Sequence, residues 1–269
     1  MPNKDNVDRP ITLMGIGRSG TSLLESCFRR QKTMQTLGET GALIFGTAAG
    51  APIAEMPSKQ AFEDRYAYCG HTVRTLFVNL EPSDRDTWFH KPIGLPKFIR
   101  WGALPGEKTP EGFPLEWYWR VLESAFPEGA WLCCLRNPWD VVLSWERFAG
   151  WRQEDIWRDV GIVYRILRHR MERFRKILLF SDLVDHGETT LKDLFALLGL
   201  PWSDSLLEPF KYKVSVKPDH EIMKDYREAW GSARRPTVTD EVAELIVGTW
   251  KFAGGEFESP AQFQGVFPF

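Results

Sequence analysis

The sequence contains few cysteines and carries little net charge. Four of its 269 residues are cysteine, and 34 basic against 36 acidic residues leave a formal net charge of −2. The cysteines do not have the spacing of a metal site, which predicts reduced core residues in a cytoplasmic protein. The near-neutral balance disfavours nucleic acid or an anionic membrane surface as the main partner, so any basic site is local.

The sequence also lacks long apolar runs. No run reaches about 18 apolar residues, so we expect no membrane-spanning helix. The first ten residues, MPNKDNVDRP, are polar and do not resemble a signal peptide. No repeat or low-complexity segment occurs, and the length allows a large core, so we expect one domain over residues 1–269.

A glycine-rich stretch near the N-terminus, ITLMGIGRSGTSLL (residues 11–24), organises the interpretation of the chain. Its first four residues are apolar and predict a buried strand, and the glycines that follow allow a sharp turn. From Thr21 onward, apolar residues recur at helical spacing. A loop between a strand end and a helix N-terminus is an anion site, because the first N–H groups of the helix point into it.

This loop has the glycine spacing of a P-loop but lacks its lysine. Thr21 stands where the nucleotide-binding lysine of G-x-x-x-x-G-K-[ST] belongs, and Arg18 lies inside the loop instead. Backbone donors, hydroxyl groups and one guanidinium can together hold a phosphate. The residues expected to do so are Arg18, Ser19, Gly20, Thr21 and Ser22. An ordinary strand-turn-helix start is the alternative, and a second site is needed to decide.

Along the rest of the chain, predicted strands alternate with predicted helices. We expect strands at 88–92, 130–135 and 177–180 and helices at 57–80, 116–126, 160–176, 190–198 and 239–250, with a loop over 33–51 and an irregular segment over 92–114. This alternation predicts an α/β fold: a parallel sheet flanked by helices in three layers, like that of P-loop NTPases. Ligands of such sheets bind outside the carboxyl ends of the strands.

A second strand-to-helix junction lies at WLCCLRNPWDVVLSW, residues 131–145. Arg136 follows the strand, Asn137 and Pro138 are a typical N-cap and first helical residue, and Ser144 lies about two helical turns further on. Arg136 and Ser144 are therefore expected to converge on one phosphate. A magnesium-holding strand would end in aspartate, so this junction predicts direct anion binding with no metal ion.

Two such junctions in this order resemble the sulfotransferase family, which uses 3′-phosphoadenosine 5′-phosphosulfate (PAPS). The second segment matches the family's R-[DN]-P-x-D-x-x-x-S pattern, and AFPEGAWLCCLRNP and ILLFSDLVDHGETTLKDLFALLGLPW are similar to further family segments. The resemblance covers about residues 11–28 and 107–202. Arg18 resembles the bacterial, glycan and tyrosyl-protein branches, whereas the C-terminal R-K-G motif of the cytosolic branch is absent.

The resemblance implies transfer of a sulfuryl group from PAPS to an acceptor hydroxyl, without a metal ion and with adenosine 3′,5′-bisphosphate (PAP) as product. It implies that the first loop holds the 5′-phosphosulfate and that Arg136 and Ser144 hold the 3′-phosphate. The acceptor is a hydroxyl-bearing small molecule, lipid or glycan. The alternatives are a P-loop small-molecule kinase and a nucleotide-binding protein of the same fold without turnover.

The catalytic base implied by the resemblance is a glutamate after the first helix, which is Glu39 in QTLGET. His90 is the rival, because the cytosolic branch uses histidine, and His71 is a weaker one. For the leaving group, Arg18 is the first candidate. Lys91 and Lys108 both resemble the family's K-x-P element; we prefer Lys91, which lies at a predicted strand end. A set of tryptophans either packs in the core or stacks on an acceptor: Trp101, Trp117 and Trp119.

Overall fold

The computed structural model describes residues 9–40, 67–76, 87–92, 113–211 and 248–251. The chain divides into two compact units. The first comprises Met1–Leu13, Lys32–Trp131 and His169–Arg173, and the second comprises Met14–Gln31, Leu132–Arg168 and Phe174–Phe269. The strand pairs described within the two units are parallel, which confirms the predicted α/β class with a parallel sheet. That residues 1–269 act as one domain remains a prediction.

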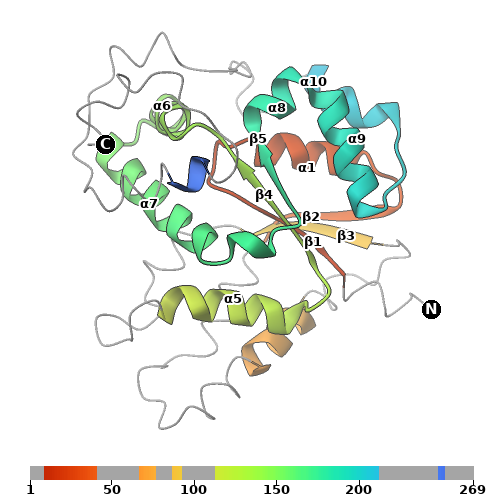
Figure 1. The fold of residues 1–269 in the computed structure, drawn as a ribbon, viewed down its shortest axis with the longest axis horizontal. Coiled ribbons are helices and arrows are strands. Elements are labelled where there is room, and N and C mark those ends of the chain that lie inside the picture. The colour runs from red at the N-terminus through yellow and green to blue at the C-terminus, as the bar shows by residue number, and fades with distance from the viewer. Residues whose placement is uncertain (1–8, 41–66, 77–86, 93–112, 212–247, 252–269) are drawn as a thin grey trace. The chain divides into compact units, whose positions relative to one another are not determined.

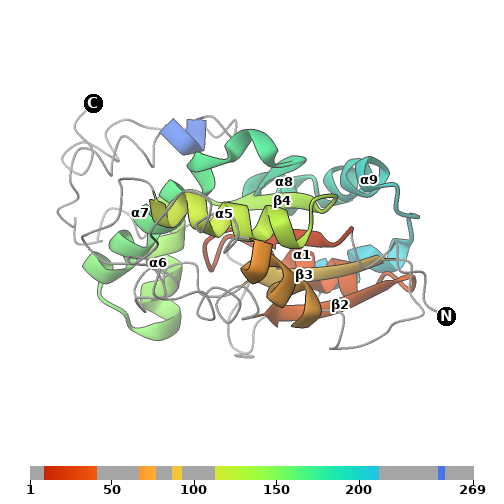
Figure 2. The same ribbon diagram turned by 90° about the horizontal axis from the view of Figure 1, so that it is seen from below.

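The first unit contains a parallel ladder in the order β2-β3-β1. Figure 2 shows β2 and β3 side by side, and residue 36 of β2 pairs with residue 89 of β3. The unit's elements are β1 (Ile11–Met14, up to residue 13), β2 (Met34–Thr40), β3 (Thr87–Pro92), α5 (Phe113–Ala125), the 3₁₀ turn η3 (Met171–Arg173) and a helical segment over 67–76.

Aromatic residues form part of the core of the first unit. Trp119 of α5 is fully buried and stacks on Trp131, with ring centroids 5.0 Å apart. The Arg173 guanidinium lies over the Trp131 ring at 5.4 Å. Trp119 is therefore a packing residue rather than a residue that lines an acceptor pocket. The side chain of Trp117 and all of Trp101 lie outside the described part of the chain.

The second unit is rich in helices and contains the parallel pair β4–β5 (Figure 1). Phe28 of α1 stacks on Phe195 of α9 at 5.1 Å, α8 packs on α9, and α1 contacts η4 and α10. The unit's elements are α1 (Thr21–Arg29), β4 (Ala130–Leu135, from residue 132), α6 (Pro138–Ala149), α7 (Gln153–His169), β5 (Lys176–Leu179), α8 (Phe180–Asp185), α9 (Gly187–Leu198), the 3₁₀ turn η4 (Asp204–Leu207), α10 (Glu208–Lys211) and a helical turn over 248–251.

Several predicted elements are confirmed with their local signals. β1 and β4 occupy the predicted residues, and α1 begins at the predicted Thr21. α6 begins as expected, because the Asn137 side chain accepts a hydrogen bond from the Trp139 N–H at 3.0 Å and Pro138 is the first helical residue. α9 ends at a left-handed Gly199. The predicted helix over 57–80 is confirmed for its described part, residues 67–76.

Several boundaries differ from the predictions, and α5 and α9 each begin three residues earlier than expected. The segment expected to be a loop, 33–51, contains β2, whose residues 34–40 pair with β3 through an irregular register next to Gly38. Hydrogen bonds to a neighbouring strand supply the order that its polar, glycine-interrupted sequence does not predict. The helix expected over 160–176 begins at residue 153 and ends at 169, and β5 starts at 176, one residue early.

All four cysteines are buried and none forms a disulfide, as the sequence predicts. Burial raises the pKa of the Cys27 thiol to about 12, so this group is neutral at physiological pH. Within the described residues, no helix combines the length and the apolar composition that crossing a bilayer requires.

Candidate anion-binding site

The loop of residues 15–20 leads directly into α1. Gly20 is the N-cap residue, with a left-handed φ of 90°, and no described side chain caps the helix. The amides of the first helical turn lack partners within a helix, so they and the helix dipole favour an anion at this point. The backbone here has the form that the predicted anion site requires, and the binding of an anion remains a prediction.

Glycine allows close packing of the loop against β4 and α8. A Cβ atom at Gly15 would lie 2.4 Å from the carbonyl oxygen of Cys134, and one at Gly20 would lie 2.5 Å from the ring of Phe180. Neither contact is possible for a real Cβ atom without movement of its neighbour. The loop consequently follows the surface of β4 and α8 at a distance that other residues do not permit.

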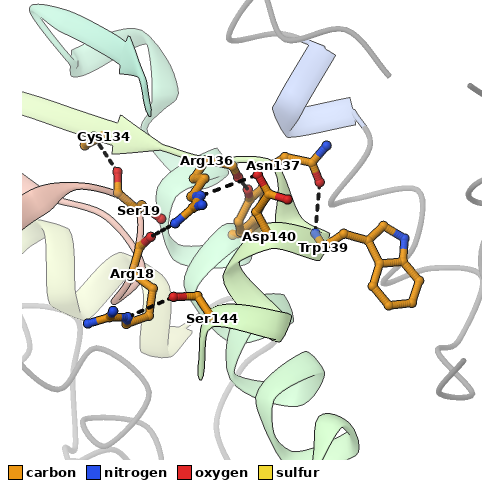
Figure 3. Close-up of polar contacts among 9 residues, drawn as sticks. Arg18, Ser19, Cys134, Arg136, Asn137, Trp139, Asp140 and Ser144 are labelled. Atoms are coloured by element: carbon orange, nitrogen blue, oxygen red, sulfur yellow. Dashed lines mark hydrogen bonds and ion pairs between the residues drawn. The ribbon is translucent and has the colours of Figure 1, made fainter. Parts of the chain in front are cut away.

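Three successive carbonyl groups of the loop are held by side chains of the β4–α6 segment. Gly17 accepts from Trp145 Nε1 (3.0 Å), Arg18 from Arg136 Nη1 (3.3 Å) and Ser19 from Cys134 Sγ (2.7 Å). Figure 3 shows the second and third of these bonds. These bonds hold the peptide units that carry the N–H groups of residues 18 to 20, of which the Ser19 N–H donates to the Ile16 carbonyl at 3.2 Å.

Cys134 can act as a donor because its thiol stays protonated. Burial raises its pKa, and the nearby Arg136 cation opposes that rise only in part. Cys134 is fully buried, so its bond to the Ser19 carbonyl is shielded from water. The residue therefore has a definite role in holding the loop in addition to core packing.

Arg136 is buried and belongs to a network behind the loop. Its Nε lies 3.5 Å from Asp140 Oδ2, and its guanidinium stacks over the Phe180 ring at 4.4 Å. Its own carbonyl accepts a hydrogen bond from the Tyr164 hydroxyl at 3.3 Å. Because the Arg136 side chain is 7% exposed and that of Asp140 is 5% exposed, this ion pair depends on its internal partners rather than on water (Figure 3).

Arg18 is held at its backbone and at its side chain. Its φ of 74° is left-handed, which is unusual for a residue with a Cβ atom. Its Nε donates to Ser144 Oγ at 3.1 Å, and its guanidinium lies over the Phe148 ring at 4.5 Å. In Figure 3 the Arg18 side chain extends toward Ser144 and away from Arg136. These contacts give the guanidinium a fixed orientation at the loop.

The Ser19 hydroxyl is a buried polar group of the loop. Ser19 is fully buried, and among the described residues its Oγ has no hydrogen-bond partner. A buried hydroxyl without a partner costs free energy. Together with the uncapped N-terminus of α1 and the cation of Arg18, this hydroxyl provides donors of the kind that bind a phosphate or sulfate group.

The structure gathers the predicted anion-binding residues in the second unit. Arg136 donates a hydrogen bond to the Arg18 carbonyl, and Ser144 accepts one from the Arg18 side chain. Arg18 therefore links the two residues. The predicted set gathered there is Arg18, Ser19, Gly20, Thr21, Ser22, Arg136 and Ser144.

The candidates for the chemical step lie in the first unit. Glu39 in β2 is paired in register with Lys91 in β3, and His90 is paired with Thr12 in β1. These positions are at or near the carboxyl ends of parallel strands, where ligands of such sheets bind. Lys91 is buried. His71 lies exposed in the helical segment 67–76, and Lys108 lies outside the described residues.

Several residues of the site carry roles that the sequence analysis did not assign. Asp140 was part of the matched motif without a function, and its position four residues after Arg136, in the first turn of α6, was a usable signal for the ion pair. The bonds of Trp145 and Cys134 join residues more than 100 positions apart in the chain. No local pattern predicts them.

Gly20→Ala tests the close packing of the loop. We expect it to lower the free energy of unfolding by about 2–3 kcal/mol, from left-handed backbone strain and displacement of Phe180. Gly199→Ala is the matched control, since Gly199 also has a left-handed φ but an added Cβ would meet nothing within 4 Å. We expect about 1 kcal/mol for it. Urea denaturation measures the free energy of unfolding of both variants. Equal losses would contradict the close packing of Gly20 against Phe180.

Solved structures of sulfotransferase domains resemble this chain. The domain from the olefin synthase of Synechococcus PCC 7002 has a TM-score of 0.57 at 12% identity, covering 96% of this chain and 98% of that domain. The domain from the curacin biosynthetic pathway has a TM-score of 0.55 at 13% identity, covering 93% and 98%. The sequence matches no protein-family model and no curated protein. At these identities the likeness establishes the fold.

Proposed function

We propose that the protein is a PAPS-dependent sulfotransferase, from the sulfotransferase fold of this chain and the geometry of the loop of residues 15–20, which we call the anion loop. The observation that carries the proposal is Arg18, which Ser144 and Phe148 fix at the loop before α1. Among the described residues, no side chain caps this helix and the buried Ser19 hydroxyl has no hydrogen-bond partner. When bound, PAPS supplies an activated sulfuryl group. The acceptor is a hydroxyl-bearing small molecule, lipid or glycan.

The donor set of the loop favours this proposal over a P-loop kinase. Thr21 occupies the position at which a kinase loop has its phosphate-binding lysine. The strand that would carry the magnesium-binding aspartate is followed by Arg136, and the carboxylate of Asp140 is paired with that arginine. These residues suit direct binding of an anion by guanidinium, hydroxyl and amide groups.

In the proposed mechanism, the loop residues bind the phosphate that leaves with PAP. The first amides of α1 and the Ser19 hydroxyl donate hydrogen bonds to its oxygens, and the Arg18 guanidinium neutralises the charge that develops there. Ser144 accepts from Arg18 and keeps its own hydroxyl proton, which it can donate to the 3′-phosphate. Arg136 contributes positive charge to that phosphate.

The acceptor hydroxyl must lose a proton as the sulfuryl group arrives. We propose that Glu39 takes it and that His90 is the alternative base. Lys91, the register partner of Glu39, is proposed to assist the leaving group. A protein that binds nucleotide without turnover is the second candidate function, and it differs from the first only in this step.

Arg18→Ala tests the proposed function. We expect kcat for sulfuryl transfer from PAPS to fall about 100- to 1,000-fold, because the guanidinium acts on charge that appears in the transition state. The affinity for PAP should fall less. The assay is release of PAP from PAPS in the presence of a panel of phenols, alcohols and glycans.

Arg147→Ala is the matched control, because Arg147 is an exposed arginine on the same helix as Ser144. We expect wild-type turnover for it. Equal turnover in Arg18→Ala and wild type would contradict the role of Arg18, and a wild type that binds PAP but sulfates no acceptor would favour the non-catalytic alternative.

A further inference from the structure

Trp145 contacts the anion loop at its most exposed glycine. Its Nε1 donates to the Gly17 carbonyl at 3.0 Å, and a Cβ atom added to Gly17 would lie 2.5 Å from its Cζ2. The indole therefore fills the space beside the Gly17 Cα atom. A side chain at position 17 and an indole at position 145 exclude each other in this conformation.

The Trp145 ring is itself held by a cluster of aromatic residues, Trp145, Phe148 and Trp151, which we call the α6 aromatic cluster. Trp145 stacks on Trp151 with centroids 4.6 Å apart and ring planes inclined by 1°, and it meets Phe148 edge to face at 5.9 Å. Stacking with Trp151 opposes rotation of the indole away from the loop. Phe148 in turn lies under the Arg18 guanidinium.

The two peptide planes that flank Arg18 are each fixed by one side chain. The Gly17 carbonyl, held by Trp145, belongs to the plane on the N-terminal side of Arg18, and the Arg18 carbonyl, held by Arg136, belongs to the plane on the C-terminal side. The φ angle of Arg18 is the rotation about its N–Cα bond, and the first plane contains that nitrogen. Holding that plane favours the left-handed φ of 74°, which a residue with a Cβ atom adopts at a cost.

We propose that Trp145 is a positioning residue for the anion loop, which keeps Arg18 in its left-handed conformation with the guanidinium directed at the bound anion. The inference rests on the proposed function for the identity of that anion, the 5′-phosphate of PAP. Trp145 acts through Gly17 and Arg18 and does not itself contact the ligand.

Trp145→Phe tests the inference, because phenylalanine keeps an aromatic ring for Trp151 but has no N–H donor. We expect the affinity for PAP to fall about 3- to 10-fold, the usual range for one hydrogen bond. We also expect faster amide hydrogen exchange in residues 15–20 without ligand. Trp202→Phe is the matched control, since it removes an indole bond to Asp204 of 3.1 Å elsewhere in the second unit. It should change neither quantity.

The outcomes separate the inference from the proposed function. Wild-type affinity and wild-type exchange in Trp145→Phe would overturn the positioning role, and so would equal changes in Trp202→Phe, because they would reflect general destabilisation. If the wild-type protein does not bind PAP, the proposed function fails. Exchange of residues 15–20 then still decides whether Trp145 holds the loop.

Discussion

Asp140→Ala lowers the free energy of unfolding by about 3–5 kcal/mol, the range expected when one partner of a buried ion pair is removed. The Arg136 side chain is only 7% exposed, and the substitution removes the carboxylate that lies 3.5 Å from its Nε. The guanidinium is then left buried without this counter-charge. Phe180 and the Arg18 carbonyl are among the partners that remain, and neither of these two carries a negative charge. Urea denaturation followed by fluorescence measures the loss.

Asp155→Ala is the matched control for this prediction. Asp155 also pairs with arginine, at 2.9 Å from Arg158, but its side chain is 35% exposed and that of its partner is 58% exposed. Water replaces such a partner, so we expect a loss of at most about 1 kcal/mol. The double variant Arg136→Met/Asp140→Ala should recover part of the loss of Asp140→Ala, because it removes the unpaired charge. Strictly additive losses would show that the pair is not coupled.

Glu39→Gln lowers kcat for sulfuryl transfer by about 100- to 10,000-fold, the range expected when a general base is removed. Glutamine keeps the size and hydrogen-bonding capacity of the side chain but takes no proton. The affinity for PAP should stay at the wild-type value, since the anion-binding residues are unaltered. The measurements are turnover with an acceptor from the panel and calorimetric titration with PAP.

His90→Ala decides between the two candidate bases. If Glu39 is the base, we expect His90→Ala to keep turnover within about tenfold of the wild type, well short of the loss of a base. The reverse pattern, with full activity in Glu39→Gln and a large loss in His90→Ala, assigns the proton transfer to the histidine. Full activity in both variants would show that neither residue is the base.

The parts of the site with local signals were predictable from the sequence. The four apolar residues before Gly15 predict β1, and Thr21 after the glycines marks the start of α1. Asn137 and Pro138 predict the start of α6, because cap formation and the fixed φ of proline act within one turn. The convergence of the two junctions follows from the rule that parallel strands present their carboxyl ends at one edge.

The remaining parts depend on contacts that a linear pattern does not contain. The strand β2 owes its order to its neighbour β3, and its sequence, MQTLGET, has neither an apolar run nor strict alternation. The support of the loop carbonyls by Trp145 and Cys134 links residues 128 and 115 positions apart. The left-handed Arg18 is likewise a strained conformation imposed by its surroundings.

The measurement that tests the account most directly is calorimetric titration of the wild-type protein with PAP, in the presence of EDTA, against ATP with magnesium. The account predicts that PAP binds with one site per chain, without a metal ion, and more tightly than ATP with magnesium. Preferential binding of ATP with magnesium would contradict the account, because it would show that the loop of Arg18 and Ser19 serves a kinase.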